Sequence, residues 1–292
     1  MIVFKKTGAY MNIENGSASV LDKKLESDKN NLDTDKLFRI IEGIKAIIKE
    51  DSLQKQPLFL KIDETFLLQL IKKILLNSQK TYLIGITGES ASGKTTFVNN
   101  VAQAFHNSSS DDLFTTISCD DYYFDTSEEL KEAGGYEALF SKGFSLDTPN
   151  AINLELMKAH LISLKNNCGV YAPDYDFVTC QSIPSKIYKK PSRIILNEGL
   201  YVLNQNVLDV HDVKVYVFTP FNIIKDRWYK RAQGRGKTGT AADLQFEDVN
   251  RTAQVYIRPT MQEADIVLNG VSSAQYIEEI TYKILSFVKS VA

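Results

Sequence analysis

The stretch YLIGITGESASGKTTFVNN, residues 82–100, holds an apolar segment, a loop of glycines and small hydroxylated residues, and a segment with helical spacing. Inside it, Gly88, Gly93, Lys94 and Thr95 have the Gly-x-x-x-x-Gly-Lys-Thr spacing of a loop that binds phosphate. The bare pattern arises by chance in roughly one per cent of chains this long. A strand is expected before it and a helix after it, as a phosphate-binding loop requires. We therefore predict a nucleoside triphosphate site here.

Each part of this loop has an expected role. Glycines let the backbone turn so that its N–H groups approach an anion, and a helix that starts near Lys94 adds the positive end of its dipole. We expect Lys94 to reach the β- and γ-phosphates and the Thr95 hydroxyl to bind Mg²⁺. The predicted ATP-binding residues are Gly88, Glu89, Ser90, Ala91, Ser92, Gly93, Lys94, Thr95 and Thr96.

The rest of the chain alternates continuous apolar segments with amphipathic ones. This alternation predicts an α/β fold, in which a parallel sheet is covered by helices on both faces. Ligands of such sheets bind beyond the carboxyl ends of the strands. The expected strands lie at 81–88, 113–123, 192–199, 213–219 and 264–270, and the expected helices at 94–107, 149–167, 222–234 and 273–291.

The residues before the loop differ in pattern. Residues 1–31 are polar and are predicted to form an arm or a small strand-bearing extension. Apolar residues with helical spacing then follow, with a short strand expected at 57–63. We predict a mainly helical N-terminal extension at 1–79 that packs on the core or forms a subunit contact, and a domain at 80–292 that holds the phosphate loop, with an Arg-rich lid near 225–245.

Composition narrows the class of protein. Its 34 basic and 36 acidic residues nearly cancel, so no global field favours nucleic acid or an anionic membrane as a partner. Cys119, Cys168 and Cys180 form no Cys-x-x-Cys pair, which indicates free thiols in a reducing compartment. We see no apolar run of membrane-spanning length and no clear signal peptide. The expected location is cytoplasmic.

Carboxylates end two of the expected strands. Asp120 and Asp121 follow the second strand, and Glu198 ends the third. Phosphoryl transfer needs one carboxylate near the metal and another that orients the acceptor hydroxyl and takes its proton. A GTPase is disfavoured, because the nearest match to a guanine-binding Asn-Lys-x-Asp motif, at 222–226, has the wrong spacing and falls in a helix.

Together these motifs resemble the uridine kinase branch of the P-loop kinases, with phosphoribulokinase and bacterial pantothenate kinase as relatives. The resemblance covers about residues 81–270. It rests on GITGESASGKTT, on SCDDYYFD, FSLDTPNAINLELM and APDYDFVTCQS, and on IILNEGLYVL and DRWYKRAQGRGKTG. It implies a Mg-ATP-dependent kinase that forms a homo-oligomer.

The resemblance also implies roles for individual residues. Asp120 would activate the acceptor hydroxyl, Asp147 would hold ribose hydroxyls, and Glu198 would join Thr95 at the metal. The aromatic residues expected to wall the acceptor pocket are Tyr122, Tyr123, Tyr175 and Phe177.

The predicted lid carries three arginines. Arg227, Arg231 and Arg235 recur every fourth residue and so line one face of a helix. Guanidinium groups suit phosphate oxygens, and the segment GRGKTG is expected to break the helix into a mobile loop. We assign Arg231, with Asp120 and Lys94, to catalysis, and Arg227 and Arg235 to the substrate.

The acceptor is the open point. Where the family has a His and an Arg that help to bind the pyrimidine, this chain has Cys180 and Ser182. Uridine or cytidine is the leading acceptor. The alternatives are a non-nucleoside alcohol (pantothenate, glycerate or a sugar phosphate) or a non-catalytic nucleotide-dependent regulatory protein.

Overall fold

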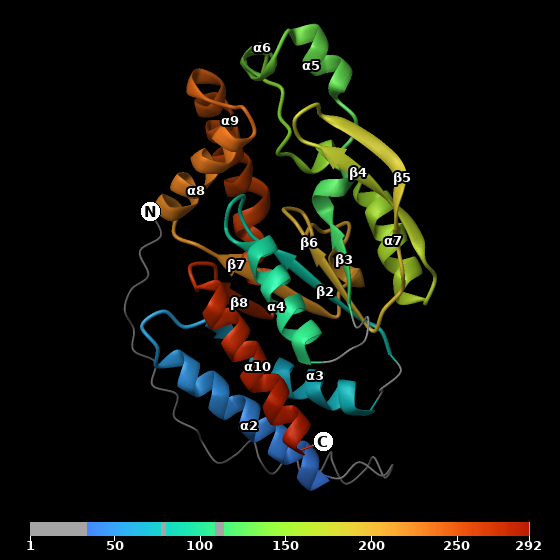
Figure 1. The fold of residues 1–292 in the computed structure, drawn as a ribbon, viewed down its shortest axis with the longest axis vertical. Helices are drawn as coiled ribbons and strands as arrows, with labels where there is room; N and C mark the ends of the chain where they lie inside the picture. Colours follow the sequence, from blue (N-terminus) through green and yellow to red (C-terminus); the bar gives the residue numbers. More distant parts are fainter. Residues whose placement is uncertain (1–33, 77–79, 109–113, 292) are drawn as a thin grey trace.

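The computed structural model describes residues 34–76, 80–108 and 114–291, which surround a six-stranded sheet in the order β1-β8-β7-β2-β6-β3 (Figure 1). All neighbours pair in parallel except β1, which is antiparallel to β8. The strands of this sheet are β1 (Phe59–Ile62), β2 (Tyr82–Thr87), β3 (Phe114–Ser118), β6 (Ile194–Glu198), β7 (Val213–Phe218) and β8 (Ile266–Asn269).

The α-helices of the described part are α2 (Thr34–Ser52), α3 (Glu64–Leu76), α4 (Lys94–Ser108), α5 (Ser127–Ala133), α6 (Tyr136–Ser141), α7 (Leu154–Lys165), α8 (Phe221–Gly234), α9 (Gly239–Thr252) and α10 (Ala274–Val291). Short helical turns are η1 (Cys119–Tyr122), η2 (Pro149–Ala151), η3 (Leu208–Val210), η4 (Ala253–Ile257) and η5 (Arg258–Glu263).

Helices cover both faces of the sheet, as predicted. On one face, Val98 of α4 and Ile277 of α10 pack on strand residues such as Ile86. On the other face, Met157 and Leu161 of α7 are fully buried in a second, larger apolar cluster. The α/β fold with a mostly parallel, doubly covered sheet is therefore confirmed.

Strand register decides which polar groups meet at the carboxyl edge. Within the sheet Ile86 pairs with Glu198, and Glu198 in turn pairs with Ser118. The phosphate loop follows β2 and Asp120 follows β3, so both emerge beside Glu198. Three segments that are far apart in sequence thus converge at one edge.

Part of the N-terminal extension belongs to the sheet itself. The strand expected at 57–63 is β1, which pairs with β8 and forms one edge of the sheet. The carboxylate of Asp51, at the end of α2, accepts hydrogen bonds from the backbone N–H groups of Leu58 (2.8 Å) and Phe59 (2.9 Å) and from the Tyr276 hydroxyl of α10 (2.7 Å). Residues 1–33, which hold the predicted arm, lie outside the described residues. The domain boundary at 79/80 stays a prediction.

Our sequence analysis did not predict several elements near the acceptor side. The strands β4 (Val170–Asp176) and β5 (Gln181–Lys189) form a separate antiparallel hairpin, and α5, α6 and α9 are further additions. The segment APDYDFVTCQS, residues 172–182, forms the turn of this hairpin and the strand residues on either side of the turn.

The lid breaks as predicted, but helix resumes after the break. The helix α8 ends at Gly234, and α9 starts at Gly239. Trp228 and Ala232 of α8 pack on Phe246 and Val249 of α9 in an apolar cluster of their own. The lid is therefore a helical hairpin with its own small core.

We predict that Asp51→Ala lowers the free energy of unfolding by about 2–4 kcal/mol, because it removes a charged acceptor from three donors in a buried place. Urea denaturation measures this. Glu50→Ala is the matched control, since Glu50 pairs with Lys283 at the surface, and its loss should cost under about 1 kcal/mol. Equal costs for the two variants would contradict the anchoring role of Asp51.

Candidate active site

Two glycines hold the phosphate loop in a shape that few other residues could adopt. Gly88 has φ +153° and Gly93 has φ +103°. A Cβ at Gly88 would lie 2.5 Å from the carbonyl oxygen of Val217. A third glycine, Gly270 after β8, lies against the loop, since a Cβ there would lie 2.1 Å from the carbonyl oxygen of Ser92. The loop therefore fits closely against the ends of β7 and β8.

Lys94 is buried at the base of the loop. Its Nζ donates to the carbonyls of Gly88 and Glu89, both at 3.0 Å. Burial lowers its pKa, while the carboxylates of Glu198 and Asp120 act in the opposite direction. The first N–H groups of α4, which starts at Lys94, have no partner within their helix. This end of the loop therefore places a cation and N–H donors side by side, and their binding of an anion stays a prediction.

An ion pair that our sequence analysis missed fixes the other end of the loop. Arg258 donates to both carboxylate oxygens of Glu89, from Nε at 3.0 Å and Nη2 at 2.9 Å. Its Nη2 also donates to the amide oxygen of Asn250 (2.7 Å). We had assigned Glu89 to ATP binding, and the structure engages its side chain with this arginine. The two residues are 169 positions apart, so no local pattern relates them.

A threonine and a glutamate form the candidate metal site. The Thr95 hydroxyl donates to Glu198 Oε2 (3.3 Å), and the Ser118 hydroxyl donates to Glu198 Oε1 (3.2 Å). Burial raises the pKa of Glu198, and the nearby Asp120 adds to this rise. Within the described part of the chain no group of three or more His, Cys, Asp or Glu residues gathers to hold a metal. A hydroxyl and one carboxylate fit Mg²⁺, which completes its shell with water and substrate phosphate oxygens.

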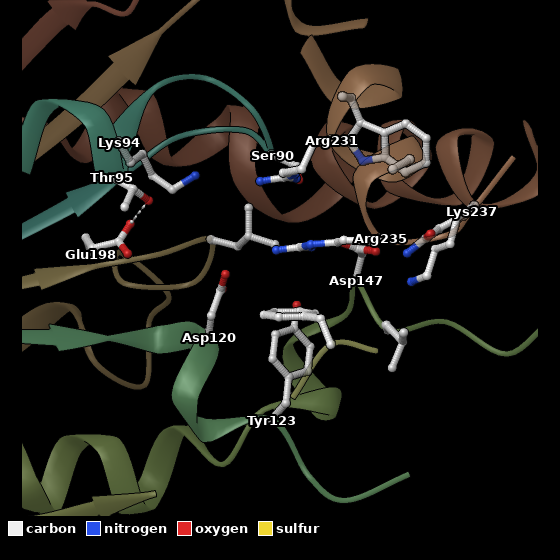
Figure 2. A pocket seen from close by; sticks show the side chains of 16 residues that line it. Ser90, Lys94, Thr95, Asp120, Tyr123, Asp147, Glu198, Arg231, Arg235 and Lys237 are labelled. Carbon is white, nitrogen blue, oxygen red and sulfur yellow. Dashed lines mark hydrogen bonds between the residues drawn. The ribbon is translucent and has the colours of Figure 1, made fainter. Parts of the chain in front are cut away.

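Asp120 points into a cavity that joins the phosphate loop to the lid (Figure 2). Figure 2 shows Lys94, Thr95 and Glu198 at one end, Asp147 and Lys237 at the other, and Asp120 between them. The other predicted residues that line this cavity are Ser90, Tyr123, Phe177, Arg231 and Arg235.

Asp147 is a buried carboxylate at the acceptor end. Burial raises its pKa to about 7, and the charge of Asp248 adds to the rise, whereas Arg231 and Lys237 oppose it. The backbone around it is held by the Tyr201 hydroxyl, which donates to the Asp147 carbonyl, and by Ser145, which accepts from the Asp147 N–H (3.3 Å). This carboxylate changes its charge near neutral pH.

The three lid arginines have different surroundings. Arg231 donates to the Ser90 hydroxyl of the phosphate loop, and the guanidinium of Arg235 lies 4.1 Å from the centre of the Phe177 ring. Arg227 lies outside the cavity and donates to the Gly270 carbonyl (2.9 Å). Of the three arginines predicted to line one face of the helix, Arg231 and Arg235 therefore line the cavity, and Arg227 lies outside it.

The lid arginines also set the size of the cavity, which is about 60 Å³. Pockets for small-molecule ligands usually measure about 300–1,000 Å³. Two substrates can enter only if α8 and α9 move away from the phosphate loop.

The predicted aromatic wall divides into residues that line the cavity and residues that support it. Tyr123 and Phe177 line it. Tyr175 packs against both of them, tilted against Tyr123 and edge-to-face with Phe177, with ring centres 5.0 Å from each. Tyr122 is buried on the far side, where its hydroxyl bonds to Nδ1 of His160 (2.9 Å), so it does not wall the pocket.

Two polar lining residues were not among our predicted site residues. Lys237 is buried with its Nζ 4.1 Å from the centre of the Tyr136 ring, and burial lowers its pKa to about 8. Gln245 has a buried side-chain oxygen without a hydrogen-bond partner in the described structure. Lys237 belongs to the cationic segment GRGKTG, and this charge was the one feature of the sequence that could have pointed to Lys237 as a site residue.

The positions that differ from the family lie beside the cavity and do not line it. Cys180 is buried with φ +56°, and its Sγ lies 3.5 Å from the Tyr136 hydroxyl. The backbone N–H of Ser182 donates to Asp125 (3.0 Å). Neither side chain reaches the cavity as the lid stands.

No helix in the described ranges is both long enough and apolar enough to cross a membrane.

Comparison with known proteins adds to this geometry. Residues 83–276 match the family model "Phosphoribulokinase / Uridine kinase family". A uridine kinase of Borrelia garinii subsp. bavariensis is 30% identical over 213 residues, 72% of this chain and 95% of the relative. A uridine kinase of Staphylococcus aureus is 31% identical over 212 residues, 71% of this chain and 97% of the relative. The crystal structure of a putative fructose transport system kinase from Silicibacter sp. TM1040 has a similar fold, with a TM-score of 0.51 and 22% identity over 65% of this chain and 90% of that one.

We predict that Gly88→Ala weakens ATP binding at least about tenfold and lowers the free energy of unfolding by about 1–3 kcal/mol, because the new Cβ meets backbone in a strained conformation. Calorimetric titration and urea denaturation measure the two effects. Gly234→Ala is the control for stability, since a Cβ there has nothing within 4 Å. An ATP affinity unchanged in Gly88→Ala would show that the loop backbone does not hold the nucleotide.

Proposed function

The chain belongs to the phosphoribulokinase and uridine kinase family, and from this premise we propose that it is a Mg-ATP-dependent kinase that phosphorylates the 5′-hydroxyl of uridine or cytidine. The observation that carries the proposal is that Lys94, which follows β2, and Asp120, which follows β3, line one cavity beside the phosphate loop. A homo-oligomer and a cytoplasmic location stay predictions.

In the proposed reaction the chain supplies charge and position. The loop amides and Lys94 bind the triphosphate, while Thr95 and Glu198 hold Mg²⁺, which neutralises phosphate charge. Asp120 accepts the proton of the acceptor hydroxyl as its oxygen bonds to the γ-phosphorus and the bond to the β-phosphate oxygen breaks. Arg231 would stabilise the charge that develops on the transferred group.

The acceptor end supports a sugar or another polyol. An ionised Asp147 accepts hydrogen bonds from two hydroxyls, as a ribose would offer. Tyr123 and Phe177 provide flat apolar surface for a base. Lid closure over both substrates would exclude water from the transfer.

A second candidate has a specific observation in its favour. Arg235 and Lys237 line the acceptor end, whereas Cys180 and Ser182 do not. Two cations suit an alcohol that carries a carboxylate or phosphate, such as pantothenate, glycerate or a sugar phosphate. An ATP-consumption screen with each acceptor separates the candidates. The variant Lys237→Met should abolish turnover of an anionic acceptor, whereas it should keep the rate with a neutral nucleoside within about tenfold of the wild-type rate. If the protein consumes ATP with none of these acceptors, the alternative that remains is a non-catalytic, nucleotide-dependent regulatory protein.

We predict that Asp120→Asn lowers kcat about 10³-fold, because it removes the proton acceptor, and leaves ATP affinity within about threefold. Initial rates with the best acceptor and ATP titration measure this. Asp121→Asn makes the same change one residue away, outside the cavity, and should keep kcat within about threefold. Full activity of Asp120→Asn with every acceptor would refute the assigned base.

We predict that kcat/KM for the acceptor rises as pH increases from about 6 to 8, because Asp147 ionises near pH 7 and its charged form binds hydroxyls. Asp147→Asn should lose this rise. The raised pKa of Asp147 means that the folded protein favours the neutral carboxyl. The resulting contribution to the free energy of unfolding is complete below the ordinary pKa of 3.8 and is lost as pH rises through about 7. Asp147→Asn without ligand should therefore be more stable than the wild type at pH 8, and a lower stability there would contradict the assignment.

A further inference from the structure

A second cavity lies at the opposite, amino-terminal edge of the central sheet. It measures about 690 Å³, which is within the range of small-molecule sites. It lies where Lys80 leads into β2, where Arg193 leads into β6, and where α7 ends at Lys165. The candidate active site is at the other ends of the same two strands.

The cavity is lined by cations. Lys80, Lys165, Lys190 and Arg193 contribute to its wall, and none of the described residues that line it carries a carboxylate. The whole chain has a formal charge of −2, so this gathering does not reflect the average composition.

One carboxylate behind the wall positions several of these cations. The side chain of Asp212 is only 7% exposed, and it accepts from Lys80 Nζ at 3.0 Å and lies 2.9 Å from Lys165 Nζ. The Nζ of Lys73 is 3.9 Å away. The backbone N–H of Leu83, in β2, also donates to this carboxylate (3.1 Å). A single negative charge therefore faces three lysines and cannot balance them all.

Two lysines around Asp212 respond in opposite ways. The pKa of Lys80 is raised, chiefly by its hydrogen bond to Asp212. Burial lowers the pKa of Lys73, and interactions with Lys80 and the charge of Lys165 lower it further, even though Asp212 acts in the opposite direction. Arg193 and Lys190 add two more charges on the far wall. An anion in the cavity would relieve this repulsion.

We propose that this cavity binds a small polyanion with two or more linked phosphate groups, whether inorganic or part of a nucleotide. Lys80, Lys165 and Arg193, with Asp212 behind the two lysines, leave a net positive charge, and each phosphate group carries about −1.5 to −2 at neutral pH. The side-chain amides of Asn166 and Asn167 and the Thr81 hydroxyl line the same space and can donate to phosphate oxygens. The site is separate from the phosphate loop and does not depend on the proposed kinase reaction.

The test is calorimetric titration of inorganic tripolyphosphate into the full chain at low salt. Lys94→Ala serves as the background, so that the phosphate loop contributes little. Lys190→Gln with Arg193→Gln in that background should weaken binding at least about tenfold, since two charges on the wall are lost. Both residues are exposed, so the fold should persist, which a melting curve checks.

Lys55→Gln with Lys61→Gln is the matched control, because both residues are exposed near β1, the far edge of the sheet. It makes the same charge change and should leave affinity within about threefold. Hydrogen exchange should slow at 164–168 and 191–195 when tripolyphosphate binds. Two results would overturn the proposed site. One is an affinity for tripolyphosphate that is the same in the Lys190/Arg193 variant as in the background, and the other is a control variant that lowers this affinity as much as the Lys190/Arg193 variant does.

Discussion

The whole site depends on a close contact between backbones, in which the phosphate loop lies directly against the ends of β7 and β8. At Gly88 and at Gly270 there is no room for a Cβ, because carbonyl oxygens of Val217 and Ser92 occupy that space. The Thr219 hydroxyl, just after β7, donates to the Ser92 carbonyl at 2.8 Å and holds the contact. Because the loop is fixed in this way, its N–H groups are oriented before any ligand binds, and little conformational entropy is lost on binding.

The same edge concentrates charge in a buried place, which is costly unless the charges balance. At the loop end, Lys94 lies among the carboxylates of Glu198 and Asp120. At the acceptor end, Asp147 lies near Arg231 and Lys237, and its pKa of about 7 indicates that they offset only part of the burial cost. Such buried, perturbed groups in one cleft are typical of sites that perform chemistry.

The sequence was informative wherever a local pattern decides the structure. The phosphate loop, the five parallel strands and the position of Asp120 at a strand end follow from short-range spacing and apolar runs. The Glu89–Arg258 pair was out of reach, because an ion pair between distant residues leaves no periodic trace. The hairpin β4–β5 was missed because β5 contains Pro184 and several exposed polar residues, which obscure a strand pattern. Tyr122 was misplaced because adjacent residues, here Tyr122 and Tyr123, point in different directions, and only the fold decides which one faces the cavity.

The lid explains how so small a cavity can belong to a site for two substrates. Its helices α8 and α9 share an apolar cluster around Trp228 and Phe246, and Leu244 of α9 also packs against the main core. Its contacts with the site include those of Arg231 with Ser90 and of Arg235 with Phe177. A triphosphate would compete for Arg231 and an acceptor for the surface of Phe177, so each substrate can replace a contact that keeps the lid shut. Arg231 and Arg235 are thus the lid groups that bound substrates would meet first.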